Sequence, residues 1–382
     1  MLSVQLVLSL QVYTQQLPEE ASQADLLLMA AVADAFEMSS ASAACVAQLA
    51  GLPADALESG TVTAAFTLPD GVAGQESSKQ LLQRATERLQ QLLGDLELTL
   101  RDAAKRQQLE QLPHGALLAL LQDQQTRVAA EGTAVAAVAL WVAAQEAAGG
   151  SVPLEQRQQL AAAIRMVQLP SMYLATVLPS IGWLQGVLPM HHILAFMAAK
   201  GVDAKNRREL AESGGFAGDS AAEADTWMTW LAADAREQSG CDKVTVTVQV
   251  PAHELHAREA GGKAGPWESE LVMWGGYEFG VRLELFNARQ PMPALILRGT
   301  GSTYQHQLHQ ATAHLDVVFS CLADGAVKAI AHDRSVWLND VTITLFDKAA
   351  LDMSDGWQPE RLAPFLHDGK LTIRMTVLEL LP

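Results

Sequence analysis

Hydrophobic and polar positions follow two different patterns along the chain, and the change falls near residue 240. Before it, leucines recur every three or four residues between Leu81 and Leu100, which predicts one long amphipathic helix. The segment Ala24–Phe36 follows Ser22, a residue type that caps helix N-termini, and is also expected to be helical. Residues 1–240 are therefore predicted to form an almost entirely helical region.

Other apolar runs in this region predict further helices. They lie at Ala116–Leu121, Thr133–Ala148, Leu154–Val167 and Thr226–Arg236. Trp141 belongs to the run AVAAVALWV, which is bounded by Glu131 and Glu146. A run this apolar predicts a helix that is buried on two sides, with Trp141 inside.

Beyond residue 240 the pattern changes to period two. Lys243–Val250 (KVTVTVQV) alternates β-branched and polar residues, which is typical of a half-buried strand. Similar stretches follow at Tyr277–Phe286, Leu295–Arg298, Leu315–Leu322, Val341–Phe346 and Leu371–Leu380. Short strands without long helices between them favour an antiparallel β-sandwich. The predicted fold class is thus α+β multidomain, an all-α N-terminal module followed by a β-sandwich.

One uncharged segment is long enough to be compared with a membrane span. From Met166 to Ala199 there is no Asp, Glu, Lys or Arg. However, Pro170, Pro179 and Pro189 divide it into short pieces, so short helices packed in a protein core are expected instead of a membrane span. The N-terminal residues also lack the basic region and cleavage site of a signal peptide.

Charge and cysteine content narrow the choice of partners and compartment. The chain has 26 Lys and Arg against 43 Asp and Glu, a formal charge of −17, and no basic block. Nucleic acid is therefore not an expected partner, because phosphate backbones are held by clustered basic side chains. The three cysteines, Cys45, Cys241 and Cys321, form no CxxC pair. A reducing, intracellular location, cytoplasmic or nuclear, is predicted.

The histidines do not predict a metal site. His306, His309 and His314 lie in HQLHQATAH, and His253 and His256 in HELHAR. In a strand, spacings of three and five residues do not place all of these side chains on one face. Polar histidines in loops beside strands are the interpretation we favour.

No residue set in the sequence indicates catalysis, so no enzyme and no cofactor are predicted. There is no GxSxG motif, and the glycine-rich segments 214–218 and 299–302 lack the lysine of a phosphate-binding loop. Cys45 lies in an alanine-rich predicted helix and is expected to be a small buried hydrophobic residue.

Aromatic residues cluster at the start of the predicted sandwich. They are Trp267, Trp274, Tyr277, Phe279 and Phe286. Core packing is the first interpretation of such a cluster. A second interpretation stays open for Trp274 or Tyr304, because strand edges with aromatic residues can hold extended peptides. These two are the candidate peptide-contact residues.

Several segments of the helical region resemble known domains. Val12–Thr14, the segment ADLLLMAAVADAFEM and Ala44–Cys45 resemble the second half of a BTB/POZ domain. The segment LLGDLELTLRDAAKRQQLEQLPHGALLALLQD, with its Leu112–Pro113 turn, and the later Leu140–Val142 look like a BACK domain. The order of these motifs is that of a BTB–BACK protein.

The region after residue 240 resembles a MATH (TRAF-like) domain. Gly275–Tyr277 leads into VRLELF in the manner of that family's first strand pair. Phe365–Leu380 (FLHDGKLTIRMTVLEL) is similar to its last strand. The resemblances imply a partial BTB/POZ domain at residues 1–70, a BACK-like domain at 78–210 and a TRAF-like sandwich at 241–382.

These families together imply a function. The resemblance implies a protein-interaction adaptor that brings an unknown target protein to a cullin-RING ubiquitin ligase. The dimerising half of a BTB domain precedes these motifs in the family's order, so a homodimer is expected only where that half is present. The alternative is a structural scaffold or interaction protein without a ligase partner.

Overall fold

The computed structural model describes most of the helical region and the strands that follow it. The described residues are 21–171, 173–200, 202, 206, 230, 235–239, 244–251, 253–254, 267–268, 270, 272–286, 290–299, 312–319, 335–337, 366–367 and 370–381. The chain divides into two compact units. One is Met1–Arg127 with Ala143–Val152, and the other is Val128–Val142 with Pro153–Pro382. The predicted domain bounds lie elsewhere and stay a prediction.

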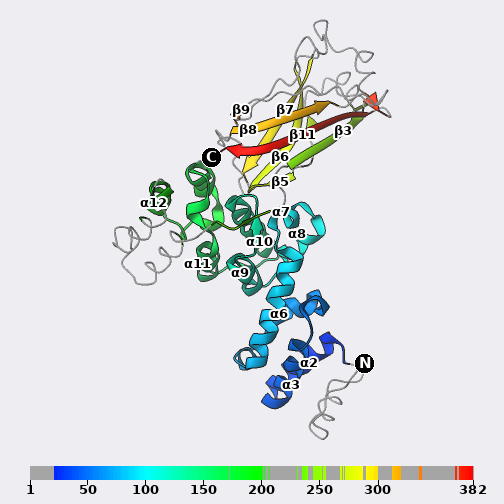
Figure 1. Cartoon of the computed structure of the whole chain (residues 1–382), viewed down its shortest axis with the longest axis vertical. Coiled ribbons are helices and arrows are strands. Elements are labelled where there is room, and N and C mark those ends of the chain that lie inside the picture. The colour runs from blue at the N-terminus through cyan, green and yellow to red at the C-terminus, as the bar shows by residue number, and fades with distance from the viewer. Residues whose placement is uncertain are drawn as a thin grey trace. The chain divides into compact units, whose positions relative to one another are not determined.

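The first unit is built from helices, shown blue to cyan in Figure 1. They are α2 (Gln23–Ala35), α3 (Ser39–Ala50), the short 3₁₀ helix η1 (Ala54–Ala56), α4 (Ser59–Ala65), α5 (Asp70–Ala73), α6 (Glu76–Leu93), α7 (Leu96–Arg101), α8 (Ala103–Glu110) and α9 (His114–Gln122). Helix α6 packs against α3, α4 and α9. It therefore forms the centre of this unit.

The predicted helix cap at Ser22 is confirmed. The Ser22 hydroxyl accepts a hydrogen bond from the Asp25 amide at 3.2 Å. In return, the Asp25 carboxylate accepts one from the Ser22 amide at 3.3 Å. This reciprocal pair is a capping box, which satisfies two N–H groups at the helix start. The helix begins at Gln23, one residue before the predicted start, and ends at Ala35.

The prediction of one helix from Leu81 to Leu100 was wrong. Helix α6 ends at Leu93, and Gly94 follows as its C-cap. Asp95 then caps a new helix, α7, by accepting a hydrogen bond from the Leu98 amide at 3.2 Å. The leucine spacing continues across this break, so hydrophobic periodicity alone did not reveal it.

The second unit begins with α10 (Glu131–Ala147), whose last five residues belong to the first unit. The other helical elements are α11 (Leu154–Ala163), η2 (Met166–Gln168), η3 (Tyr173–Val177), η4 (Leu178–Ser180), η5 (Gly182–Leu184) and α12 (Met190–Lys200). Trp141 is 3% exposed, which confirms its predicted burial. The predicted helix Leu154–Val167 ends early, because Ile164 adopts an extended conformation.

The uncharged segment after Met166 forms several short helices, as its prolines predicted. Within the described residues, the structure contains no helix with the length and apolarity needed to cross a membrane. At the other end of this region, Arg236 lies outside regular structure and directly precedes a strand, so the predicted helix Thr226–Arg236 does not reach its last residue.

Strands make up most of the described part of the chain after α12. They are β2 (Glu237–Gln238), β3 (Val244–Pro251), β4 (Trp267–Glu268), β5 (Val272–Trp274), β6 (Tyr277–Phe286), β7 (Gln290–Gly299), β8 (Thr312–Phe319), β9 (Ser335–Trp337), β10 (Leu366–His367) and β11 (Lys370–Leu381). The short strand β1 (Arg127–Val128) pairs with β2. Five of the six predicted strands overlap β3, β6, β7, β8 and β11, and the predicted Leu295–Arg298 lies inside the longer β7. The sixth, Val341–Phe346, lies outside the described residues.

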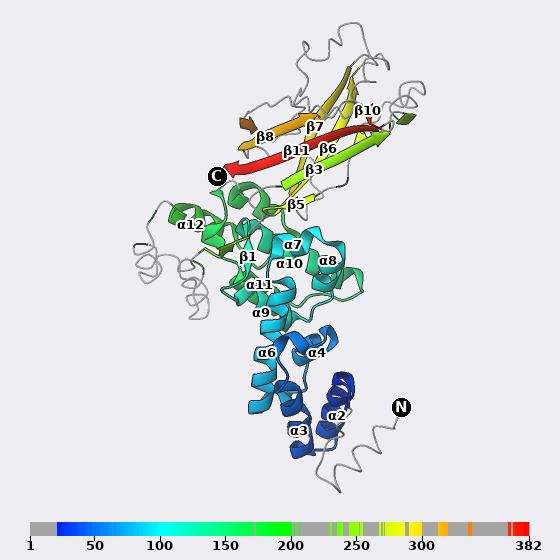
Figure 2. The same cartoon turned by 45° about the vertical axis from the view of Figure 1, so that its right-hand side comes forward.

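The strands from β3 onwards form two antiparallel sheets, which Figure 2 shows from a second direction. In one sheet, β11 lies between β3 and β8, and β9 pairs with β8. In the other, β6 pairs with β7 along its whole length and with β4 and β5 on its opposite side. The packing of the two sheets into a sandwich stays a prediction.

Candidate functional site at the start of helix α10

Of the two candidate peptide-contact residues, the structure describes the backbone of one. Trp274 is the last residue of β5 and pairs with Tyr277, the first residue of β6. Tyr304 lies outside the described residues. Trp274 is thus placed directly before the turn of the β5–β6 hairpin.

That turn consists of Gly275 and Gly276. Their φ angles are 61° and 84°, which is the left-handed region that side chains with a Cβ rarely adopt. A two-residue hairpin turn with positive φ at both positions is type I′, and its twist matches that of the flanking strands. Both glycines are buried. The sequence Gly-Gly is therefore well suited to this backbone conformation.

A third glycine lies against this turn. A Cβ atom added to Gly132, in the first turn of α10, would lie 2.7 Å from the Gly275 carbonyl oxygen and 3.0 Å from Cε2 of Tyr173. A Cβ atom added to Gly276 would overlap the Gly132 carbonyl group. The tip of the hairpin and the start of α10 therefore meet backbone to backbone.

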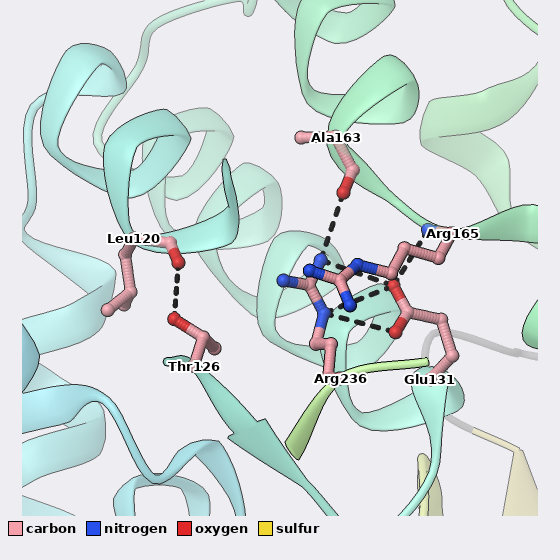
Figure 3. Close-up of polar contacts among 6 residues, drawn as sticks. All are labelled: Leu120, Thr126, Glu131, Ala163, Arg165 and Arg236. Carbon is pink, nitrogen blue, oxygen red and sulfur yellow. Dashed lines mark hydrogen bonds and ion pairs between the residues drawn. The ribbon is translucent and has the colours of Figure 1, made fainter. Parts of the chain in front are cut away.

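The residue before Gly132 carries a buried charge. The carboxylate of Glu131 forms an ion pair with the guanidinium of Arg236, with Nε and Oε2 3.0 Å apart. The Glu131 side chain is 2% exposed and that of Arg236 is fully buried. The Arg165 amide donates a further hydrogen bond to Oε1 at 2.8 Å. Figure 3 shows these contacts converging on the carboxylate.

Arg236 also donates a hydrogen bond to the C-terminal end of helix α11. Its Nη2 atom donates to the Ala163 carbonyl oxygen at 2.9 Å. Nearby, the indole N–H of Trp230 donates to the Ala161 carbonyl oxygen at 2.9 Å. The last carbonyl groups of a helix lack partners within that helix, and a positive charge beside them is favourable. Trp230 and Arg236 therefore satisfy carbonyl groups at the C-terminus of α11.

Two further contacts attach Trp230 and Ser239 to the helical part of the unit. The Trp230 ring packs edge-on against Phe196 of α12, with ring centres 5.4 Å apart. The Ser239 amide donates to the Val128 carbonyl oxygen at 3.0 Å. Described contacts with the helical part of this unit thus continue through Ser239, five residues before β3 begins.

The chemistry of this site is that of a structural ion pair. Both oxygens of the Glu131 carboxylate accept hydrogen bonds from buried donors. A buried charge is tolerated when it is paired and its remaining lone pairs are satisfied. Its role is to hold the start of α10 in place.

Sequence reasoning missed these residues. Glu131 was used only to bound an apolar run, and Arg236 only to end a predicted helix. A signal was present, because an acidic residue directly before a run that predicts a fully buried helix needs a buried partner. Identifying that partner 105 residues away requires the fold.

A different buried polar contact lies in the first unit. Thr126 is fully buried, and its hydroxyl donates to the Leu120 carbonyl oxygen at 2.5 Å, as Figure 3 also shows. The Arg127 amide donates to the Gly94 carbonyl oxygen at 2.8 Å. These bonds hold the chain that follows α9 in place.

Two other predictions concern ionisable groups. Cys45 is fully buried, which confirms its prediction as a small buried residue, and burial raises the pKa of its thiol to about 11. Of the histidines considered as ligands, His253 is exposed, His314 lies in β8, and His256, His306 and His309 lie outside the described residues. Over the part of the chain that is described, no three His, Cys, Asp or Glu side chains are grouped as metal ligands would be.

Comparison with known proteins gives no relative for this chain: no family model, no curated protein and no solved structure matches it. The BTB/POZ, BACK and MATH resemblances therefore rest on the motifs quoted above.

Proposed function

We propose that this chain is a non-enzymatic protein-interaction adaptor inside the cell. The helical part would act as the spacer, and the strand-rich part would contact a target protein. Two features support the proposal: the order of the BTB-like, BACK-like and MATH-like motifs along the sequence, and the change from helices to strands after α12.

The observation that carries the target contact is the edge formed by β4 and β5. One side of each strand pairs with β6, and no described strand pairs with the other side. An unpaired edge offers N–H and C=O groups to an extended peptide, which adds as a further strand. Trp274 lies on this edge and would supply side-chain specificity.

The opposite edge of the same sheet is less suited to a peptide. Strand β7 contains Pro291 and Pro293, two residues apart and therefore of the same orientation in the ladder. Proline has no N–H to donate, and prolines within sheets occupy positions whose N atom faces away from the neighbouring strand. The outer edge of β7 thus lacks donors at two positions, which favours the β4–β5 edge.

The finer proposal is that the target is delivered to a cullin-RING ubiquitin ligase. Its support is the resemblance of residues 1–70 and 78–210 to BTB/POZ and BACK domains, which in that family contact the ligase and act as spacer. No contact in the described residues bears on it, so it depends on a binding experiment.

The experiment uses the full chain in two binding assays. A peptide-display selection on the immobilised chain should yield extended peptides, and Trp274→Ala should weaken their binding. Trp337→Ala, in β9 of the other sheet, is the matched control and should not. Equal loss in both variants, or no selected peptide, contradicts the edge-binding proposal.

The second assay measures binding of a purified cullin to the same chain by titration calorimetry. Saturable binding supports the ligase adaptor. If peptides bind but no cullin does, the scaffold alternative is favoured. That alternative has one supporting observation in the helices, where large apolar side chains are exposed, among them Phe36 at 68% and Leu194 at 60%.

A further inference from the structure

The contact between the β5–β6 hairpin and α10 raises a question that the proposed function does not answer. The tip of the hairpin and the start of α10 are packed so closely that any Cβ at Gly132 forces a displacement. Which of the two elements moves depends on how firmly each is held. The surroundings of Glu131 decide this.

We propose that the start of α10 is a rigid socket for the hairpin, locked by the Glu131–Arg236 ion pair, so that the hairpin undocks whenever the two elements are forced apart. The socket is defined as Glu131, Gly132 and Tyr173. The socket holds the tip of the β5–β6 hairpin against the start of α10 and so fixes the position of the β4–β5 edge within this unit.

The helix side of the contact is immobilised from two directions. The Glu131 carboxylate accepts from the Arg236 guanidinium and from the Arg165 amide, all in the interior of the unit. A shift of the α10 start would stretch these bonds and leave a buried charge poorly paired, which is costly. The Tyr173 ring beside Gly132 is fully buried, so a rotation of the ring would displace closely packed neighbours.

The β5 arm of the hairpin is held less firmly than the β6 arm. Strand β5 contributes only the three residues Val272–Trp274 to the ladder with β6, whereas β6 also pairs with β7 along its whole length. Short pairing is a feature of segments that open locally at low cost. A methyl group at Gly132 should therefore displace the hairpin and leave the ion pair intact.

The test is hydrogen exchange by mass spectrometry on the full chain carrying Gly132→Ala. Amide exchange in 272–276, which is β5 and the turn, should accelerate by about tenfold or more, which corresponds to about 1.4 kcal/mol of opening free energy. The Arg165 amide, which donates to Glu131, should keep its protection. Gly182→Ala is the matched control in the same unit, because a Cβ there has no atom within 4 Å.

Two results would overturn the proposal. One is unchanged exchange in the hairpin, which would show that the contact absorbs a methyl group. The other is equal acceleration of the hairpin and the Arg165 amide, which would show that the helix start moves. If Gly132→Ala does not fold, the unmodified chain decides: its hairpin amides should exchange faster than the Arg165 amide, and equal or slower exchange contradicts the proposal.

Discussion

Helices α6 and α10 have 18 and 17 residues, but they are buried in different ways. Helix α6 buries a single stripe with a spacing of four, made by Leu81, Ala85, Leu89 and Leu93. The first eight residues of α10, 131–138, are all buried. A one-sided helix exposes its polar groups to water, whereas a helix buried all round must pair every polar group inside the protein.

The ion pairs on the two helices show the consequence of this difference. On α6, Arg84 and Glu87 are 3.0 Å apart, and their side chains are 47% and 40% exposed. On α10, Glu131 and Arg236 are also 3.0 Å apart, but their side chains are 2% and 0% exposed. Equal distances therefore do not mean equal contributions to stability, because only the second pair has lost its contact with water.

The largest expected effect is that of Trp141→Ala on α10. Trp141 is 3% exposed, so its removal leaves a cavity that should cost about 3–5 kcal/mol of unfolding free energy. Leu82→Ala on α6, where the side chain is 39% exposed, is the matched change and should cost less than about 1 kcal/mol. Urea unfolding followed by helical circular dichroism measures both, and similar losses would contradict the contrast between the helices.

Loss of the buried ion pair is the next largest effect. Arg236→Met keeps most of the packing but leaves the Glu131 carboxylate buried without its cation, which should cost about 3 kcal/mol. Amide exchange along α10 and α11 measures the loss. A cost below about 1 kcal/mol would mean that water reaches the carboxylate.

The ionisation of the Cys45 thiol reports on the burial of helix α3. Helix α3, which contains Cys45, packs against α6. Burial raises the pKa of this thiol from 9.0 to about 11. Because the folded-state pKa is the higher one, the contribution to stability is complete below pH 9 and is lost as the pH rises towards 11.

The size of that loss is bounded by the pKa difference. Two pKa units correspond to about 2.7 kcal/mol, and partial access of water would reduce it. The pH dependence of unfolding between pH 8 and 11 should be smaller in Cys45→Ala, which has no thiol to ionise. Identical profiles for the two chains would show that the thiol is not buried in the folded protein.

The smallest expected effect belongs to the exposed pair on α6. Arg84→Ala removes a contact that is screened by water and salt, and it should change the unfolding free energy by less than about 0.5 kcal/mol. The same unfolding measurement at low and high salt checks this. A loss comparable to that of Arg236→Met would remove the distinction drawn between the two ion pairs.

The sequence was sufficient for features that depend on neighbouring residues. The Ser22 cap, the buried stripe of α6 and the burial of Trp141 each follow from spacing or residue type within one segment. The break at Gly94–Asp95 also depends on neighbouring residues. It was missed because the leucines of α7 continue the spacing of the leucines of α6. An Asp two residues after the end of a leucine stripe could have been recognised as a cap.

The candidate site could not be predicted in the same way. Glu131 and Arg236 are 105 residues apart, and strands β2 to β5 lie between Arg236 and the Gly275–Gly276 turn. Each has an ordinary local interpretation: a helix start, a helix end and a hairpin turn. Their common role is visible only in the tertiary structure, where the Gly275–Gly276 turn packs against Gly132, the residue that follows Glu131.

The central claim is that the buried ion pair fixes the start of α10, so that the hairpin is displaced when the two elements are forced apart. A double-mutant cycle with Gly132→Ala and Arg236→Met, read by hairpin amide exchange on the full chain, tests it most directly. With the ion pair removed, the helix start can shift, so Gly132→Ala should accelerate hairpin exchange less than it does in the unmodified background. Effects that add to within about 0.5 kcal/mol would contradict the claim.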